Sequence, residues 1–239
     1  MNIRLLFATF SIILSSMAAS QVYDQELFDK MSPVVKISNL EAMSVGVGFF
    51  VNTDTGDYIF TNAHVCMGVE RFYKRDIGLE KLRISQVKNN IYITSEYDLR
   101  EEHIDIEEDF CSIRVKSVFY LTNFSTYNLG VFDPSSSIKT VDLFKNNIEL
   151  IPSSRYRKDY LNLGDDYSKI TNRENSYIFD HWCRKGMSGS PILNKGGEVV
   201  AMASSCVRGE SVSMPPHQKM LEGRSLNWIT KIYNEKDFK

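Results

Sequence analysis

A six-residue stretch in the last quarter of this 239-residue chain decides its fold, and it reads Gly186-Met187-Ser188-Gly189-Ser190-Pro191. Glycines on both sides of a serine let the backbone turn sharply, because glycine adopts positive φ angles without a steric penalty. Such a turn leaves backbone N–H groups pointing into a cleft, where they can hold an anion. A glycine and serine cluster alone is usually only a loop, so its interpretation depends on the rest of the chain.

Two earlier stretches contain the residue types that would make Ser188 reactive. Residues 60–66 end an apolar strand and include His64, and residues 108–115 begin another apolar strand and include Asp109. Hydrolysis of an amide bond requires a nucleophile, a base that takes its proton near neutral pH, and a buried acceptor that fixes the tautomer of the base. A serine, a histidine and an aspartate meet these three requirements.

The rest of the chain is predicted to be mostly β-structure. Its apolar runs are short and are separated by polar or turn-forming residues, which is typical of many short strands rather than of strands alternating with long helices. Residues 52–57 (Asn-Thr-Asp-Thr-Gly-Asp) and 194–197 (Asn-Lys-Gly-Gly) lie between such runs and predict two hairpin turns.

Residues 122–137, which include a proline and three consecutive serines, form the best candidate for a linker. They separate a front β unit, residues 21–121, from a back β unit of similar size, residues 138–222. Residues 223–239 are predicted to form an amphipathic C-terminal helix, because apolar residues recur at helical spacing behind a possible N-cap, Ser225. These apolar residues are Leu226, Ile229 and Tyr233.

The first twenty residues are typical of a secretory signal peptide. Arg4 is followed by the uncharged residues 5–14 and then by small residues up to Ser20, the order of a basic region, an apolar region and a cleavage zone. Ten apolar residues span only about 15 Å as a helix, half of a bilayer's hydrocarbon core, so a membrane anchor is the weaker alternative. We therefore expect an exported protein, secreted or periplasmic, without a stable membrane anchor.

The composition excludes several classes of protein. With 43% hydrophobic and 24% charged residues, the chain has the profile of an ordinary soluble globular protein. Its 28 Lys and Arg residues are balanced by 30 Asp and Glu residues, which gives a net charge of −2. Such a chain lacks the basic surface that recognition of a phosphate backbone requires, and we expect no nucleic-acid partner.

The order of the histidine, the aspartate and the serine, separated by 45 and 79 residues, resembles that of the chymotrypsin-fold (trypsin-like) serine proteases. Residues 61–66 look like this family's T-A-A-H-C block, residues 109–113 like its D-(I/L)-A-L-L block, and residues 186–191 like its G-x-S-G-(G/S)-P block. The sequences of these three motifs are closer to those of bacterial secreted members, such as the glutamyl endopeptidases and periplasmic trypsin-like peptidase domains, than to those of digestive trypsins.

This resemblance implies an all-β fold of two six-stranded antiparallel β-barrels with a C-terminal helix. His64 and Asp109 would belong to the first barrel and Ser188 to the second. The implied function is that of a monomeric serine endopeptidase without metal or cofactor, which cleaves protein or peptide substrates. Ser188 would attack the carbonyl, His64 would move the proton and Asp109 would orient His64. Asp105 is the other plausible acid, but Asp109 alone opens an apolar strand.

By the same resemblance, the backbone N–H groups of Gly186 and Ser188 would hold the developing oxyanion, a contribution worth about 3–4 kcal/mol per donor in other enzymes. Zymogen-type members carry an aspartate where this chain has Met187, and that aspartate accepts a freed N-terminal amine. Met187 cannot form this ion pair, so we expect no activation by that route.

Four cysteines allow three disulfide pairings in an exported protein, and a zinc site is not indicated by their spacing. The resemblance favours a bond between Cys183 and Cys206, close to one that braces the substrate pocket in many family members. Cys66 lacks the family's usual partner upstream of the histidine. A bond between Cys66 and Cys111 would instead join the histidine and aspartate segments, and it requires Cα atoms within about 7 Å.

The resemblance places His181 or Trp182 at the base of the primary substrate pocket, and Ala203 and Ser204 on its opposite wall. None of them is a carboxylate that would select lysine or arginine, and glutamyl endopeptidases have a histidine in place of Ala203. Trp182 either fills the pocket and favours small side chains or points away and packs in the core.

Two other functional classes compete with this interpretation. An α/β-hydrolase esterase requires Gly-x-Ser-x-Gly, with an acid and a histidine after the serine. Position 190 is a serine here, and His217 is the only histidine that follows Ser188. The main alternative is a catalytically inactive secreted protease homologue that acts as a protein-binding module, because intact motifs do not prove an open pocket.

Overall fold

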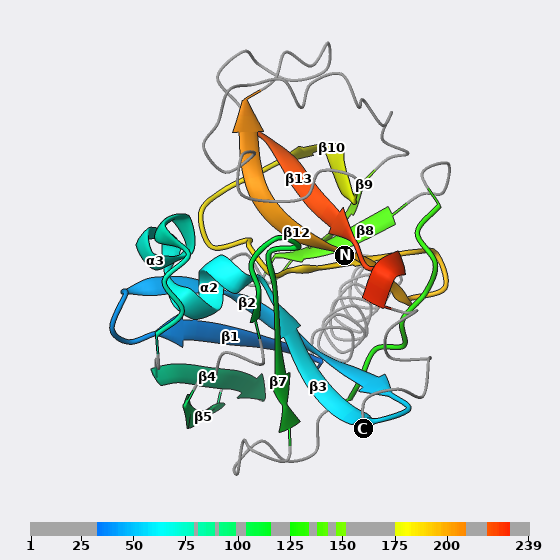
Figure 1. The fold of residues 1–239 in the computed structure, drawn as a ribbon. Helices are drawn as coiled ribbons and strands as arrows, with labels where there is room; N and C mark the ends of the chain where they lie inside the picture. Colours follow the sequence, from blue (N-terminus) through cyan, green and yellow to red (C-terminus); the bar gives the residue numbers. More distant parts are fainter. Residues whose placement is uncertain are drawn as a thin grey trace, which may run out of the picture.

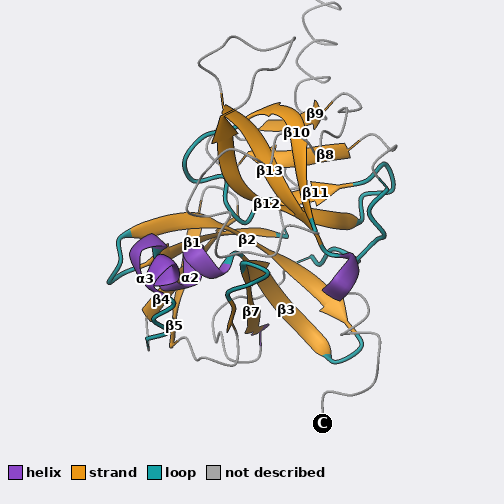
Figure 2. Cartoon of the chain, turned by 45° about the horizontal axis from the view of Figure 1, so that its top comes forward, coloured by secondary structure: helices purple, strands orange, loops and turns teal. Residues whose placement is uncertain are grey.

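The computed structural model describes residues 33–78, 81–88, 91–98, 104–115, 125–133, 138–142, 147–151, 175–208 and 219–229. The expected signal peptide, residues 1–20, lies outside these residues, as do residues 230–239 of the expected C-terminal helix. Within them the chain consists mainly of antiparallel β-sheet (Figures 1 and 2), which confirms the predicted fold class.

The front half of the chain forms a sheet with the strand order β5-β4-β1-β2-β3-β7-β6. The predicted hairpin turn at residues 52–57 connects β2 and β3, where Thr53 pairs with Gly56. The sheet has one more strand than the six expected, because the two-residue β6 pairs with β7. The strands are β1 (Val34–Asn39), β2 (Ser44–Thr53), β3 (Gly56–Thr61), β4 (Lys81–Lys88), β5 (Ile91–Asp98), β6 (Ile104–Asp105) and β7 (Phe110–Arg114).

The back half forms a second sheet with the order β10-β13-β12-β11-β8-β9, which lies above the first in Figure 1. The second predicted hairpin turn, residues 194–197, connects β11 and β12. The strands are β8 (Ile138–Asp142), β9 (Asn147–Ile151), β10 (Ser176–Trp182), β11 (Pro191–Leu193), β12 (Val199–Arg208) and β13 (Lys219–Ser225).

Two short helices that the sequence analysis did not predict follow β3. They are α2 (Ala63–Met67) and α3 (Val69–Lys74), and Gly68 connects them with a positive φ of 81°, a conformation that favours glycine. Ala63, Met67 and Phe72 form a buried cluster that holds both helices on the front sheet. None of the helices within the described residues is long and apolar enough to cross a membrane.

The C-terminal helix begins later than predicted. Residue 223 was the expected start, but β13 continues to Ser225, and the helical residues that the structure describes are 227–229. The hydroxyl of Ser225 accepts the backbone N–H of Asn227 at 3.2 Å, as the predicted cap would. Leu226 and Ile229 are buried, because they pack against residues of both sheets.

A shared apolar core joins the two sheets. One cluster belongs to the front sheet and another to the back sheet, whereas a third contains Val47 and Phe49 of β2 together with Met202 of β12. Residues 125–133, which lie within the predicted linker, connect the halves. Tyr127 forms a bridge with β2, and Leu129 forms one with β12. The seam between the sheets is therefore well packed, and the motif residues lie along it.

Candidate active site

His64 lies in the first turn of α2, directly after β3. The strand end is anchored because the hydroxyl of Thr61 donates to the carbonyl of Val47 at 2.6 Å. The carbonyl of Asn62 then accepts the N–H groups of Val65 and Cys66, which closes the helical turn. As a result the imidazole of His64 is held at the seam between the sheets, with 14% of its side chain exposed.

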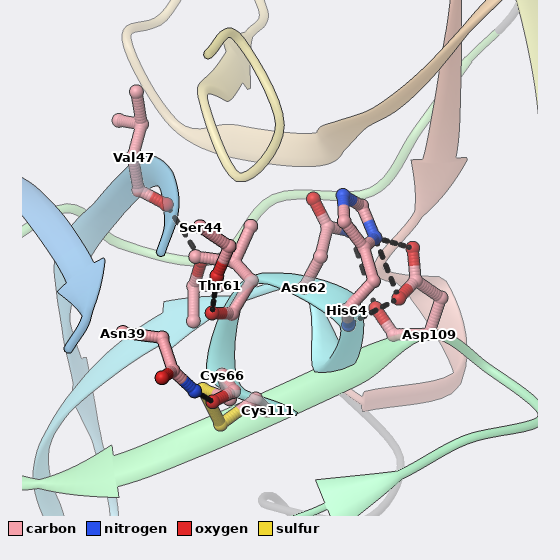
Figure 3. Close-up of a disulfide and its surroundings, with 10 residues drawn as sticks. Asn39, Ser44, Val47, Thr61, Asn62, His64, Cys66, Asp109 and Cys111 are labelled. Atoms are coloured by element: carbon pink, nitrogen blue, oxygen red, sulfur yellow. Dashed lines mark hydrogen bonds and ion pairs between the residues drawn. A yellow bond between two sulfur atoms is a disulfide. The ribbon is translucent and has the colours of Figure 1, made fainter. Parts of the chain in front are cut away.

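Asp109 ends a tight turn before β7 and has a left-handed backbone conformation, with φ 48°. Its carboxylate is completely buried. Nδ1 of His64 lies 3.0 Å from both carboxylate oxygens, and the backbone N–H of His64 donates to Oδ1 at 3.1 Å (Figure 3). The hydroxyl of Ser204 donates to Oδ2 at 2.8 Å, and the side-chain amide of Asn62 donates to the Asp109 carbonyl at 3.2 Å.

These contacts define the tautomer of His64. A carboxylate is an acceptor only, so the proton of a neutral imidazole is on Nδ1 and Nε2 is the basic nitrogen. The donors around the carboxylate of Asp109 also satisfy the rule that a buried charge needs partners. The histidine and aspartate motifs are therefore brought together in the arrangement that a general base requires.

Ser188 lies in a loop that is fixed between the two sheets. Its carbonyl accepts the N–H of Val47 in β2 at 2.8 Å, and the next N–H, that of Gly189, donates to the carbonyl of Ala203 in β12 at 2.8 Å. A Cβ atom on Gly189 would lie 1.8 Å from the Val47 carbonyl oxygen, and its φ is +86°, so only glycine fits there. Met187 is buried, which anchors the loop by packing.

The hydroxyl of Ser188 donates to the backbone carbonyl of Ser204 at 2.9 Å. Because a hydroxyl has one proton, Ser188 does not donate to His64 in this rotamer. Both residues nevertheless line the same cavity of about 800 Å³, and Gly186 lines it with them. The structure thus brings the imidazole from the front half and the hydroxyl from the back half to one cavity.

The backbone N–H groups of the serine loop fall into two sets. The N–H groups of Met187, Gly189 and Ser190 donate to protein carbonyls. Those of Gly186 and Ser188 have no protein acceptor within the part of the chain that the structure describes. Gly186 has a positive φ of 91°, a conformation that glycine adopts freely. Gly186 and Ser188 both line the cavity.

Two of the four residues expected to line the primary pocket have described side chains. Ala203 is completely buried in the core of the back sheet. Ser204 is buried as well, and its hydroxyl contacts Asp109. His181 and Trp182 end β10, where only their backbone is described. The contact between Ser204 and Asp109 was missed because the two residues are 95 positions apart and no local pattern marks it.

Two disulfides brace the site, and they are the pairs that the sequence analysis favoured. Cys66 and Cys111 join α2 to β7 with a Cα–Cα distance of 6.6 Å (Figure 3). Cys183 and Cys206 join the segment before the serine loop to β12, at 5.4 Å. Within the described residues, no group of three or more His, Cys, Asp or Glu side chains is arranged to hold a metal ion.

Comparisons with known proteins agree with this geometry. Residues 46–202, well over half of the chain, match the trypsin-like peptidase domain family. Among solved structures, the fold is similar to that of Deg5 (15% identity, 89% of this chain and 92% of that chain covered, TM-score 0.55). It is also similar to the MamO protease domain from Magnetospirillum magneticum (13% identity, 84% and 95% covered, TM-score 0.54).

A third similar structure is that of Rv3671c from M. tuberculosis (14% identity, 87% and 89% covered, TM-score 0.53). At such low identities these likenesses establish the fold alone. A search of curated protein sequences finds no match. The match over residues 46–202 and the two-sheet fold lead to one conclusion: the chain belongs to the trypsin-like peptidase domain family and is a serine-type peptidase.

Proposed function

We propose that the protein is an exported endopeptidase that hydrolyses peptide bonds through an acyl-enzyme on Ser188. One observation carries this proposal: a continuous set of hydrogen bonds runs from Ser188 to Ser204, from Ser204 to Asp109 and from Asp109 to His64. Ser188 and His64 lie at its two ends and line one cavity. This arrangement provides a nucleophile, a base and a buried acceptor for the base.

The first step is acylation. Oγ of Ser188 attacks the substrate carbonyl carbon, and Nε2 of His64 takes the hydroxyl proton. The carbonyl oxygen becomes an anion, and the N–H groups of Gly186 and Ser188 stabilise it, since both lie at the cavity and have no protein acceptor among the described residues. When the C–N bond breaks, His64 returns its proton to the leaving amine. Water then repeats the sequence and releases Ser188.

The rotamer of Ser188 suggests how substrate binding completes the site. The Ser188 hydroxyl donates to the Ser204 carbonyl, so this hydrogen bond must break before His64 can take the proton. A backbone N–H of the substrate is a suitable replacement donor for that carbonyl. In this scheme, substrate binding frees the Ser188 proton for His64.

Export is supported by two kinds of observation. Both cysteine pairs form disulfides, and disulfides persist in oxidising compartments rather than in the cytosol. The N-terminal sequence has the order of a signal peptide. We therefore propose that the enzyme acts on protein or peptide substrates outside the cytosol, as a monomer.

A protein-binding homologue without turnover is the second candidate, and the Ser188 rotamer is the observation that favours it. If the hydroxyl remained on Ser204, His64 would have no proton to take. The two candidates make opposite predictions about activity.

Casein hydrolysis by the purified protein separates these candidates. We expect release of acid-soluble peptides and a decrease in kcat of about 10⁶-fold in Ser188→Ala, as for removal of such a nucleophile in other enzymes. Ser190→Ala, which alters a neighbouring buried hydroxyl, is the matched control and should keep measurable turnover. Equal rates for the wild type and Ser188→Ala would overturn the peptidase proposal.

A further inference from the structure

The turn that ends at Asp109 connects β6 and β7 of the front sheet. We call residues 105–109 the acid turn. The carboxylate of Asp105 accepts the N–H of Glu108 at 3.0 Å, and the carbonyl of Ile106 accepts the N–H of Asp109 at 3.2 Å. The acid turn closes on the left-handed backbone of Asp109, a conformation that a residue other than glycine keeps only where its surroundings fix it.

Arg224 of β13 reaches the acid turn from the back sheet. Its side chain is 1% exposed. Its Nη1 donates to the carbonyl of Glu107 at 3.4 Å and lies 3.7 Å from a carboxylate oxygen of Glu108. A guanidinium stays charged and has several donors in one plane, so it can hold two acceptors at once. One buried cation therefore contacts both residues that directly precede Asp109.

The carboxylate of Glu108 has a second partner in the back half of the chain. Its Oε2 accepts the side-chain amide of Asn175 at 3.1 Å, and the carbonyl of Asn175 accepts the N–H of Ser225 at 2.8 Å. Ser225 directly follows Arg224 in β13. Glu108 is thus fixed by two groups that belong to this strand or are bonded to it. Only 13% of its side chain is exposed, so water and salt screen this charge pair less than a surface pair.

Two neighbouring strands of the back sheet, β12 and β13, contact the acid turn at different places. From β12, the hydroxyl of Ser204 donates to Oδ2 of Asp109 at 2.8 Å. From β13, Arg224 contacts the preceding backbone and the side chain of Glu108. The first contact orients the carboxylate of Asp109, and the second holds the backbone from which that carboxylate extends.

We infer that Arg224 is a positioning residue for the general base. It holds residues 107 and 108 so that Asp109 keeps its left-handed conformation and presents its carboxylate to Nδ1 of His64. Arg224 does not line the cavity that His64 and Ser188 share, so its effect on the reaction passes through the acid turn. For its effect on turnover, this inference rests on the proposed function. The competing role is a contact that only joins the two sheets.

The tautomer of His64 distinguishes these two roles without any need for turnover. NMR of the folded protein with isotope-labelled histidines shows which ring nitrogen of the neutral imidazole carries the proton, and the signals that are absent in His64→Ala identify this residue. An imidazole that donates to a fixed carboxylate keeps its proton on Nδ1, whereas one without such an acceptor exchanges between its two tautomers.

The main variant replaces both members of the charge pair, Arg224→Met with Glu108→Gln. Loss of one member alone would leave the other buried charge without its partner, which is strongly destabilising. Glutamine keeps an oxygen that accepts the amide of Asn175. Glu222→Gln is the matched control, because Glu222 is another buried charged residue of β13 and accepts the hydroxyl of Ser205.

At a temperature where the double variant is folded, we expect His64 to exchange between both tautomers. With a peptide ester, kcat should fall about 10²-fold, the loss that a displacement of about 1 Å causes in a well-oriented site. KM should change by less than about twofold, because the contact that is lost does not bind substrate. Glu108→Gln alone should give a smaller decrease in kcat, because Arg224 still contacts the carbonyl of Glu107. Glu222→Gln should match the wild type in all three quantities.

A wild-type tautomer and a wild-type kcat in the folded double variant would overturn the inference, however much stability is lost. The full loss of kcat in Glu108→Gln alone would also overturn it, because the positioning role would then belong to Glu108. If the wild type does not hydrolyse the ester, the proposed function fails, and the tautomers of the two proteins still decide the inference. A proton on Nε2 in the wild type would contradict both.

Discussion

Asp109 is the residue on which the geometry of the site depends most. It accepts the Nδ1 proton and the backbone N–H of His64 with one buried carboxylate, and its left-handed φ of 48° is uncommon for a residue other than glycine. The rest of the fold holds it in this conformation through Ser204 and Asn62. Its role differs from that of Asp105, whose carboxylate caps the turn by accepting the N–H of Glu108 at 3.0 Å.

Asp109→Asn therefore tests the assignment of the acid. Asparagine replaces one carboxylate oxygen by an NH2 group, which donates a hydrogen bond instead of accepting one. His64 then adopts the wrong tautomer, and we expect kcat to fall about 10⁴-fold, as in the equivalent change in another serine protease. Steady-state kinetics with a peptide ester would measure this. Asp105→Asn keeps an acceptor for the turn and should reduce kcat by less than about twofold. A larger loss in Asp105→Asn than in Asp109→Asn would contradict the assignment.

At the residue scale, the candidate site residues that the sequence predicts are those whose motifs are local. His64, Asp109 and Ser188 each lie in a short recognisable stretch. The contact of Ser204 with Asp109 joins residues 95 positions apart. The hydrogen bond from Asn39 to Cys66, which anchors the β1–β2 turn, joins residues 27 positions apart. A single sequence carries no signal for them.

At the scale of secondary-structure elements, the disulfide between Cys66 and Cys111 connects the helix that carries His64 to the strand that follows Asp109. Both cysteines are completely buried, and the bond closes a loop of 45 residues. The other disulfide closes 23 residues in the back half. The first bond therefore joins the His64 and Asp109 segments, whereas the second joins the segment before the serine loop to β12.

Replacement of Cys66 and Cys111 by alanine should lower the free energy of unfolding by about 2–4 kcal/mol, and it should lower kcat as well because His64 and Asp109 are no longer tied together. Urea denaturation and ester hydrolysis would measure both effects at a temperature where the variant is folded. The Cys183 and Cys206 pair is the comparison, for which we expect a similar loss of stability but a smaller loss of kcat. The reverse order of the two kcat values would contradict this role.

Elements with strong local signals were predicted well. The hairpin turns at 52–57 and 194–197 follow from turn chemistry alone. The helices α2 and α3 were not predicted, because five and six residues are too few for a stable periodic pattern. They form because Ala63, Met67 and Phe72 are buried against the sheet, which is a tertiary effect.

At the scale of the whole molecule, polar and apolar contacts cross the seam and join the two sheets. Ser204 of the back sheet contacts Asp109, and the buried Arg224 of β13 lies 3.7 Å from Glu108. Tyr127 packs in the shared apolar cluster. Two β units and a linker could be predicted from composition shifts, whereas the packing between the units could not, because it depends on side chains from both.

Because Tyr127 lies in the shared core, the free energy of unfolding depends on pH in the alkaline range. Burial raises the pKa of Tyr127 above its ordinary value of 10.0. In the unfolded chain this phenol ionises near pH 10, whereas in the folded protein it stays neutral. The stability is fully present below that pH and falls above it, by up to about 1.4 kcal/mol per pH unit for this group.

Tyr127→Phe removes this ionisation and keeps the ring. The free energy of unfolding of the variant, measured by urea denaturation between pH 8 and pH 11, should fall less steeply above pH 10 than that of the wild type. Parallel curves for the two proteins would contradict the buried, neutral state of this phenol.

The most direct test of the central claim is to identify the residue that an active-site phosphonylating reagent modifies. The purified protein is incubated with a fluorophosphonate, digested and sequenced by mass spectrometry. If His64 activates Ser188 across the cavity, the label is found on Ser188, and it is absent in His64→Ala. A label on another residue, or equal labelling of Ser188 in wild type and His64→Ala, would show that the imidazole and the hydroxyl do not work together.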